Sequence, residues 1–208
     1  MTNIETITLE VPDTAAAERF YADAFGLTTQ LRFRVADEPS AGFRGYTLSL
    51  TVAQPADVDS FVGTAIAAGA TQLKAPAKSM WGYGGAVQAP DGAIWTIATS
   101  AKKNTGPATR AFDAIVLLLG VADVAASKKF YVGHGLTVGK SFGRVYVEFE
   151  SGDNSVKLAL YRRKALAKQA GVAPEGSGSH RIAVGGAASA FTDPDGFAWE
   201  TTAAARLS

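Results

Sequence analysis

The feature that most constrains this chain is a duplicated motif. Residues 89–96, Ala-Pro-Asp-Gly-Ala-Ile-Trp-Thr, are echoed near the end by residues 193–200, Asp-Pro-Asp-Gly-Phe-Ala-Trp-Glu. In both copies a Pro-Asp-Gly turn ends three residues before a tryptophan. A segment with helical spacing that ends in Phe-Tyr precedes each copy, at 15–21 and 125–131. A repeat distance of about one hundred residues is too long for a solenoid, so it predicts two similar domains.

The repeat divides the 208 residues into two domains of ordinary size. We place the first domain at 1–101 and the second at 110–208. The segment 102–109 contains Gly106 and Pro107, which are typical of turns and loops. We therefore predict that this segment is the linker.

Hydrophobic periodicity predicts the elements of the first half. Polar and turn-forming residues fill 36–45, which is expected to be a loop. The expected order is strand, helix, strand, strand, helix and three strands, at 4–11, 13–25, 30–35, 46–52, 55–68, 71–73, 81–87 and 93–98.

The second half also opens with a strand and a helix, but three strands follow that helix. A short surface helix is predicted at 162–170 and a loop at 172–179. Only five residues, 185–189, separate the next strand from the closing hairpin, and a helix of three turns needs about eleven residues. The helix found at the corresponding point of the first half is therefore absent here. The other predicted elements are a helix from 123 to 133 and strands at 114–119, 138–141, 145–149, 156–161 and 181–184.

Composition excludes several classes of function. The formal net charge is +1 and like charges do not cluster, which argues against nucleic acid or an anionic membrane as a partner. The chain has no cysteine, so disulfides, thiolate metal sites and cysteine nucleophiles are excluded. The first residues lack a signal-peptide pattern, and the longest apolar run, 114–119, is far shorter than a membrane span. We expect a soluble cytoplasmic protein.

Two motifs give a family resemblance. The helix that ends in Phe-Tyr and is followed by Gly-Leu, together with Pro-Asp-Gly-x-x-Trp-Glu on the last strand, resembles the vicinal oxygen chelate superfamily. That superfamily includes glyoxalase I, extradiol dioxygenases, and bleomycin- and fosfomycin-resistance proteins. The segment 158–167 is similar to uncharacterised glyoxalase-like proteins of bacteria. The resemblance covers almost the whole chain and implies an α+β fold, in which paired βαβββ modules form curled mixed sheets around a ligand.

The resemblance implies four modules, of which the first and last are reduced. The modules at 46–98 and 114–161 are complete. One hypothesis pairs the two reduced modules with each other and the two complete modules with each other. The alternative pairs consecutive modules. Pairing between the strands at 47–52 and 115–119 distinguishes the two, because only the first hypothesis requires it.

The resemblance also implies a divalent metal held by His or Glu side chains on the first and last strands of the modules. Such ligands must be Lewis bases that converge on one point. The matching positions Thr6, Val116 and Thr96 offer no useful ligand. His180 and Glu200 are suitable, but both lie in the last module, so the set is incomplete. The alternative is that His180 caps a loop and Glu200 faces solvent or an arginine.

Aromatic residues indicate a second kind of site. If alternate residues line a cup, aromatic walls with a few hydroxyl groups suit a planar or apolar ligand. Trp81 and Tyr83 are favoured, because neighbouring glycines leave room beside them. The alternative is that these rings pack helices onto the sheet. The other candidates are Phe33, Tyr46, Trp95 and Tyr146.

These observations predict a glyoxalase-like or bleomycin-resistance-like protein that binds a small aromatic or apolar molecule in a β-sheet cup, without a complete metal site and without a cofactor. The alternative is a metal-dependent lyase, isomerase or dioxygenase that uses His180 and Glu200. Glu148 and Glu200 could serve acid–base chemistry without a metal, but no spacing singles out a catalytic pair. A homodimer is a further possibility, because members of the superfamily often complete their sheets across subunits.

Overall fold

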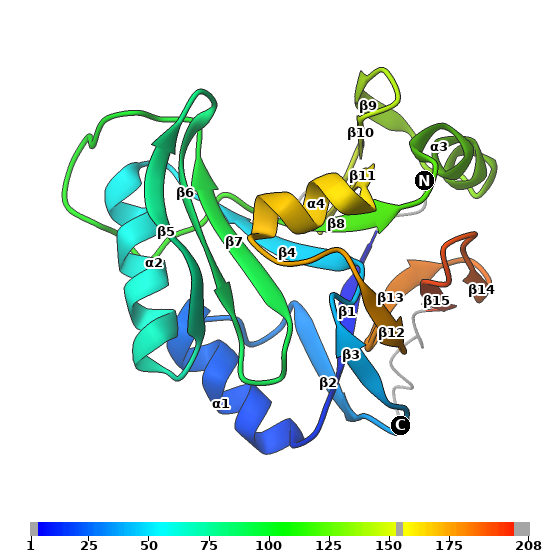
Figure 1. The fold of residues 1–208 in the computed structure, drawn as a ribbon, viewed down its shortest axis with the longest axis horizontal. Helices are drawn as coiled ribbons and strands as arrows, with labels where there is room; N and C mark the ends of the chain where they lie inside the picture. The colour runs from blue at the N-terminus through cyan, green and yellow to red at the C-terminus, as the bar shows by residue number, and fades with distance from the viewer. Residues whose placement is uncertain (1–3, 153–155, 202–208) are drawn as a thin grey trace.

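The computed structural model describes residues 4–152 and 156–201, which form two curled sheets, a two-stranded ribbon and four helices (Figure 1). None of the described helices is both long and apolar enough to cross a membrane.

The larger sheet has eight strands, four from each half of the chain. They are β4 (Tyr46–Thr51), β5 (Thr71–Ser79), β6 (Gly82–Gln88), β7 (Ile94–Thr99), β8 (Ala114–Val121), β9 (Val138–Phe142), β10 (Tyr146–Phe149) and β11 (Lys157–Arg162). Their spatial order is β5-β6-β7-β4-β8-β11-β10-β9. β4 and β8 pair antiparallel, with Tyr46 opposite Leu119 and Thr51 opposite Ala114. The two complete modules are therefore joined to each other, as the first pairing hypothesis requires.

The smaller sheet joins the two reduced modules. Its strands are β1 (Thr6–Val11), β2 (Leu31–Val35), β13 (Ile182–Ala187), β14 (Phe191–Thr192) and β15 (Ala198–Thr201). Their spatial order is β14-β15-β13-β1-β2. β1 and β13 pair antiparallel, with Thr6 opposite Gly185 and Leu9 opposite Ile182. Both sheets thus take strands from both halves, and the domain boundary at 102–109 stays a prediction.

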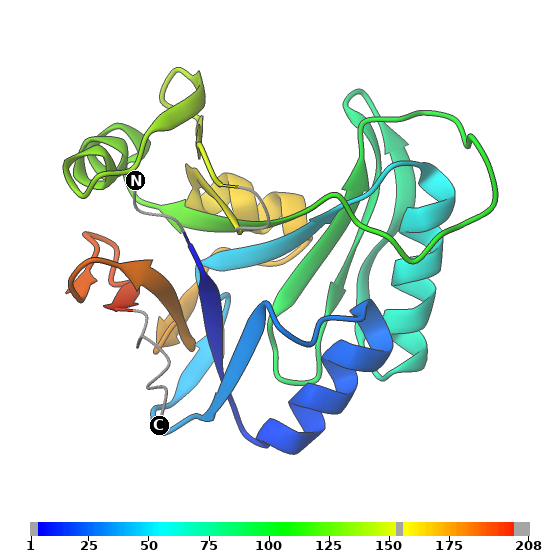
Figure 2. The ribbon, with the colours of Figure 1, turned by 180° about the vertical axis from the view of Figure 1, so that it is seen from behind.

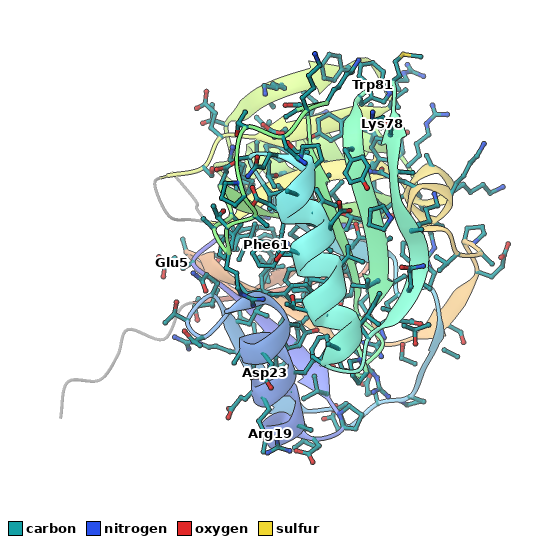
Figure 3. The ribbon with its side chains drawn as sticks, turned by 90° about the vertical axis from the view of Figure 1, so that its left-hand side faces the viewer. Glu5, Arg19, Asp23, Phe61, Lys78 and Trp81 are labelled. Carbon is teal, nitrogen blue, oxygen red and sulfur yellow. The ribbon has the colours of Figure 1, made fainter. Side chains whose placement is uncertain are left out.

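Three helices cover the outer faces of the sheets: α1 (Thr14–Phe25), α2 (Pro55–Ala67) and α3 (Val124–Gly133). Asp13 caps α1 by accepting a hydrogen bond from the backbone N–H of Ala16, and Gly26 ends it in the left-handed conformation at φ 70°. α1 and α2 lie side by side, while α3 lies at the opposite end of the molecule (Figure 2). Figure 3 faces α1 and α2, with Arg19 and Asp23 on the outer side of α1.

The first copy of the duplicated motif forms a buried network. The Tyr21 hydroxyl on α1 donates to Asp91 Oδ2 at 2.8 Å, and Trp95 Nε1 donates to the Tyr21 oxygen at 3.3 Å. Asp91 lies in the Pro-Asp-Gly turn and also accepts from the backbone N–H of Ala93. Because α1 follows β1 whereas Trp95 lies on β7, this network ties the smaller sheet to the larger one.

The second copy forms a similar network, in which the two sheets exchange their roles. The Tyr131 hydroxyl on α3 donates to Asp193 Oδ2 at 2.6 Å, and Trp199 Nε1 donates to the Tyr131 oxygen at 3.2 Å. Here the helix belongs to a module of the larger sheet and Trp199 to the smaller one. The tyrosine and the tryptophan are thus equivalent in the two halves, and each pair connects the two sheets. The aspartates are not equivalent, because Asp193 stands where the first copy has Ala89.

The helix at the end of β11 does not lie where the sequence suggested. The predicted surface helix forms as α4 (Arg163–Ala170), but it packs across the inner, concave face of the larger sheet (Figure 1). Leu166 and Ala167 are buried there against Leu118 and Ala159. Neighbours of these sheet residues, such as Leu117, point to the opposite face and into the main core. α4 thus occupies the middle of the concave face of the larger sheet.

Two predicted loops pair with each other. Ser40–Gly42 forms β3 and Gly176–Gly178 forms β12, which are antiparallel partners in the ribbon. Glycine permits this approach, because a Cβ at Gly178, where φ is +81°, would collide with the Pro39 carbonyl oxygen. Periodicity could not reveal these strands, since they are three residues long and exposed or half-buried.

β5 is longer than predicted. It extends to Ser79, although the sequence predicted a strand only to Leu73. It is an edge strand and none of its residues is buried, so it lacks the alternation of a half-buried strand. Pro76 is compatible with such an edge position.

Candidate functional site

A cavity of about 1120 Å³ lies at the end of the larger sheet where β8 and β11 begin. α4 contributes no residue to its lining, so this end of the sheet stays open. Phe112 supplies an aromatic edge, and residues near the start of β1 close one side. The charged groups that line it are Glu5, Asp113, Lys140, Glu148, Glu150 and Lys157.

Glu148 is the best-positioned acid in this cavity. It lies on β10, where Val147 and Phe149 point into the core and Glu148 points to the inner face. The Tyr146 hydroxyl donates to Glu148 Oε2 at 2.8 Å, and Lys140 Nζ lies 3.9 Å from Oε1. Burial, followed by the hydrogen bond to Glu148, raises the pKa of Tyr146 above its usual value, so its hydroxyl remains a donor.

Three of the six predicted ligand-binding rings belong to the core. Trp95 and Tyr46 are buried, and Trp95 packs against Tyr21 and Phe25 with ring centroids 5.7 and 4.8 Å away. Phe33 stacks on Tyr21 at 5.3 Å and is partly buried against the same core. The structure therefore places these three rings in helix-to-sheet packing, and none lines the cavity above.

The other three rings are more accessible but lie apart. Trp81 is 84% exposed at the tip of the β5–β6 hairpin (Figure 3). Tyr83 points to the outer face, where its hydroxyl donates to Asp59 on α2. Tyr146 is half-buried and contacts the cavity only through Glu148. Tyr146 is thus the member of the predicted set whose hydrogen bond reaches the cavity lining.

His180, a predicted metal ligand, is held by the backbone of both halves. Nδ1 lies 2.5 Å from the carbonyl oxygen of Arg44, and Nε2 lies 3.0 Å from that of Asp195. The imidazole also stacks on Phe197 at 4.1 Å. Both nitrogens therefore face hydrogen-bond acceptors, and neither presents a lone pair to a cation.

Glu200, the other predicted ligand, pairs with an arginine on the inner face of the smaller sheet. Arg34 Nη1 lies 2.6 Å from Glu200 Oε1, and Arg34 Nη2 lies 2.6 Å from Glu10 Oε1. The Ser179 hydroxyl donates to the second oxygen of Glu10. The hydrogen bond to Glu200 is the largest of the effects that raise the pKa of Arg34, so the guanidinium stays charged between the two carboxylates.

Solved structures with this architecture are known. Glyoxalase I from Zea mays matches with a TM-score of 0.62 at 13% identity, over 97% of this chain and 92% of that chain. The match decides the architecture, because it spans both sheets. This chain has the glyoxalase fold. A candidate dioxygenase from Bacillus subtilis matches with a TM-score of 0.55 at 13% identity, over 88% of this chain and 70% of that one. No protein-family model and no curated protein sequence matches the chain.

The side chains on this glyoxalase fold do not fit the divalent metal that the resemblance implies. His180 directs both nitrogens at carbonyl oxygens, and Glu200 already binds a cation, the guanidinium of Arg34. Within residues 4–152 and 156–201, no group of three His, Cys, Asp or Glu side chains is placed to hold an ion. We therefore assign no chemical step to a metal.

Sequence reasoning missed Arg34 and Glu10, although the signal was present. In the strand at 30–35, Leu31 and Phe33 alternate with the arginines, which puts Arg34 on the face opposite the core. What the sequence lacked was the pairing of β1 with β2, which sets Glu10 beside Arg34. Glu148 was recognised as an acid, but nothing in the sequence placed it in a cavity.

Proposed function

We propose that this glyoxalase fold binds a small organic molecule in the cavity beside Glu148, and that it does so without a metal at His180 and Glu200. The observation that carries the proposal is the position of Glu148, an acid that lines an open cavity and is held by a hydrogen bond from the Tyr146 hydroxyl. Burial and convergent polar groups are the general marks of a ligand site.

The charges of the lining favour a cationic ligand. Among the described residues that line the cavity, four carboxylates stand against two ammonium groups, which is an excess of two negative charges. Phe112, which is half-buried, offers apolar contact to the body of the molecule. The ligand class that best matches both properties is an aromatic or apolar molecule that carries a positive charge.

Three probes that share one ring test this proposal: benzyltrimethylammonium, benzyl alcohol and benzoate. Each is titrated into protein kept in a chelator, and the backbone amide signals are followed by NMR. We expect the cation to bind most tightly and to shift signals of Lys140, Glu148 and Lys157. Binding that requires added metal, or shifts that avoid these residues for all three probes, would contradict the proposal.

A charge-neutralising variant tests whether the cationic probe binds beside Glu148. Glu148→Gln removes the oriented carboxylate, so the affinity for the cation should fall about tenfold or more. Glu18→Gln makes the same change in net charge on the exposed side of α1 and should leave the affinity unchanged. If both variants bind the cation with equal affinity, the cation is attracted by the overall charge of the protein and not by Glu148.

A further inference from the structure

We propose a second binding site, for an oxyanion, in a pocket of about 290 Å³ between the start of α4 and the β3–β12 ribbon. A phosphate group of a small molecule is the chemistry that matches it best. The pocket lies on a different part of the fold from the cavity beside Glu148 and shares no lining residue with it. The side chains that carry the argument are Arg44, Arg163, Ser177 and His180.

Arg44 and Arg163 both belong to the lining of the pocket, and the carbonyl groups that hold the Arg163 guanidinium belong to lining residues as well. Arg163 Nε donates to the Pro174 carbonyl at 3.0 Å, and its Nη2 donates to the Phe43 carbonyl at 2.6 Å. Arg44 Nη2 donates to the Asp91 carbonyl at 2.5 Å. These acceptors are neutral, and neither arginine forms an ion pair with any residue in the described ranges. The Arg163 guanidinium therefore keeps a positive charge beside the pocket that no described carboxylate pairs with.

One donor of Arg163 has no partner in the described part of the chain. Nε and Nη2 are used, whereas no hydrogen bond is formed by Nη1. A Cβ placed on Gly45 would touch this Nη1 and would lie 3.3 Å from the ring of His180. The guanidinium and the imidazole therefore converge beside Gly45, where the missing side chain leaves space for both.

His180 forms one wall of the pocket. Its two ring nitrogens lie within hydrogen-bond distance of the carbonyl oxygens of Arg44 and Asp195, which fixes the ring beside the Arg163 guanidinium. An arginine in this position suits phosphate, because arginine donors match phosphate oxygens in geometry and charge.

The rim of the pocket is small and polar. It is a Gly-Ser-Gly-Ser segment, residues 176–179, in which Ser177 is exposed and its hydroxyl is not used by the described residues. Glu175 is the single acid among the described residues of the lining, which also contains Arg44 and Arg163. The lining thus has the opposite charge balance to the cavity beside Glu148.

The test uses inorganic phosphate as the probe and the whole protein. Phosphate is titrated at constant ionic strength, with sodium chloride as the balance, while the backbone amides are followed by NMR. We expect saturable shifts confined to residues 176–180 and the start of α4, with a Kd of about 1 mM or lower. The absence of saturable shifts in this pocket would overturn the proposal.

Two substitutions of equal charge separate a local site from general attraction. Ser177→Glu places a carboxylate at the rim of the pocket, where it competes for the guanidinium groups, so the affinity for phosphate should fall at least about tenfold. Ser100→Glu adds the same charge at an exposed position outside the pocket and should leave the affinity unchanged. Equal phosphate affinities in the two variants would overturn the assignment. Both serines are exposed, so neither change disturbs packing.

Discussion

Tyr21 and Tyr131 occupy equivalent places in the two halves, and each is fully buried. Each hydroxyl donates to an aspartate and accepts from a tryptophan. The sequence showed both tyrosines and both tryptophans as a repeat, but not that they touch. Burial is also the main reason that the pKa of Asp193 is raised, and the hydrogen bond from Tyr131 opposes that rise.

Replacing Tyr131 by Phe should destabilise the protein by about 1–3 kcal/mol, because Asp193 loses a donor and Trp199 loses its acceptor inside the core. Urea unfolding followed by fluorescence measures the change. Tyr161→Phe is the matched control, since the Tyr161 hydroxyl has no hydrogen-bond partner in the described residues. A loss no greater for Tyr131→Phe than for the control would show that the network is not stabilising.

The buried tyrosines also predict how stability depends on pH. Burial raises the pKa of Tyr21, Tyr46 and Tyr131 above the usual value near 10. Below pH 10 both the folded and the unfolded forms keep these protons. As the pH rises above 10, the unfolded chain loses them first, so the free energy of unfolding should fall.

Absorbance of tyrosinate at 295 nm measures this ionisation. These three residues should ionise together with unfolding, as monitored by circular dichroism in the same alkaline titration. Their ionisation while the circular dichroism signal is still native would show that the phenols are less buried than the structure places them.

At the scale of elements, α4 shows what periodicity can and cannot predict. The sequence predicted a short surface helix at 162–170, and the helix forms as α4. The sequence did not indicate that Leu166 and Ala167 would be buried on the concave side of the sheet, since that depends on strands from both halves. Lys74 on β5 fixes the far end, where its ammonium donates to the carbonyls of Lys168 and Gln169 at 2.8 and 2.7 Å.

Leu166→Ala tests whether α4 is an integral part of the core. Leu166 is 1% exposed, so its truncation should cost about 2–5 kcal/mol of unfolding free energy. Lys164→Ala, at an exposed position of the same helix, should change stability by less than about 0.5 kcal/mol. Denaturant unfolding of both variants gives the comparison. If Leu166→Ala changes the free energy of unfolding no more than Lys164→Ala does, α4 does not contribute to the stability of the core.

At the scale of the whole molecule, each of the two large sheets contains strands from both halves of the chain. Most elements could be predicted from local periodicity, but the short strands β3 and β12 could not. That the first and last modules are reduced followed from the resemblance to βαβββ modules together with loop length. The sheet pairing remained one of two hypotheses until β4 and β8 were seen side by side. The candidate site could not be predicted, since Glu5, Glu148 and Lys157 come from three separated strands or their ends.

The central claim is that this glyoxalase fold works without a metal at His180 and Glu200. Elemental analysis of untagged protein tests it most directly, after incubation with Ni²⁺, Zn²⁺, Mn²⁺ and Fe²⁺ and extensive dialysis. We predict metal contents far below one equivalent, unchanged in His180→Ala and Glu200→Ala, because the imidazole faces two carbonyls and the carboxylate binds Arg34. One equivalent of metal in the native protein that is lost in both variants would contradict the claim.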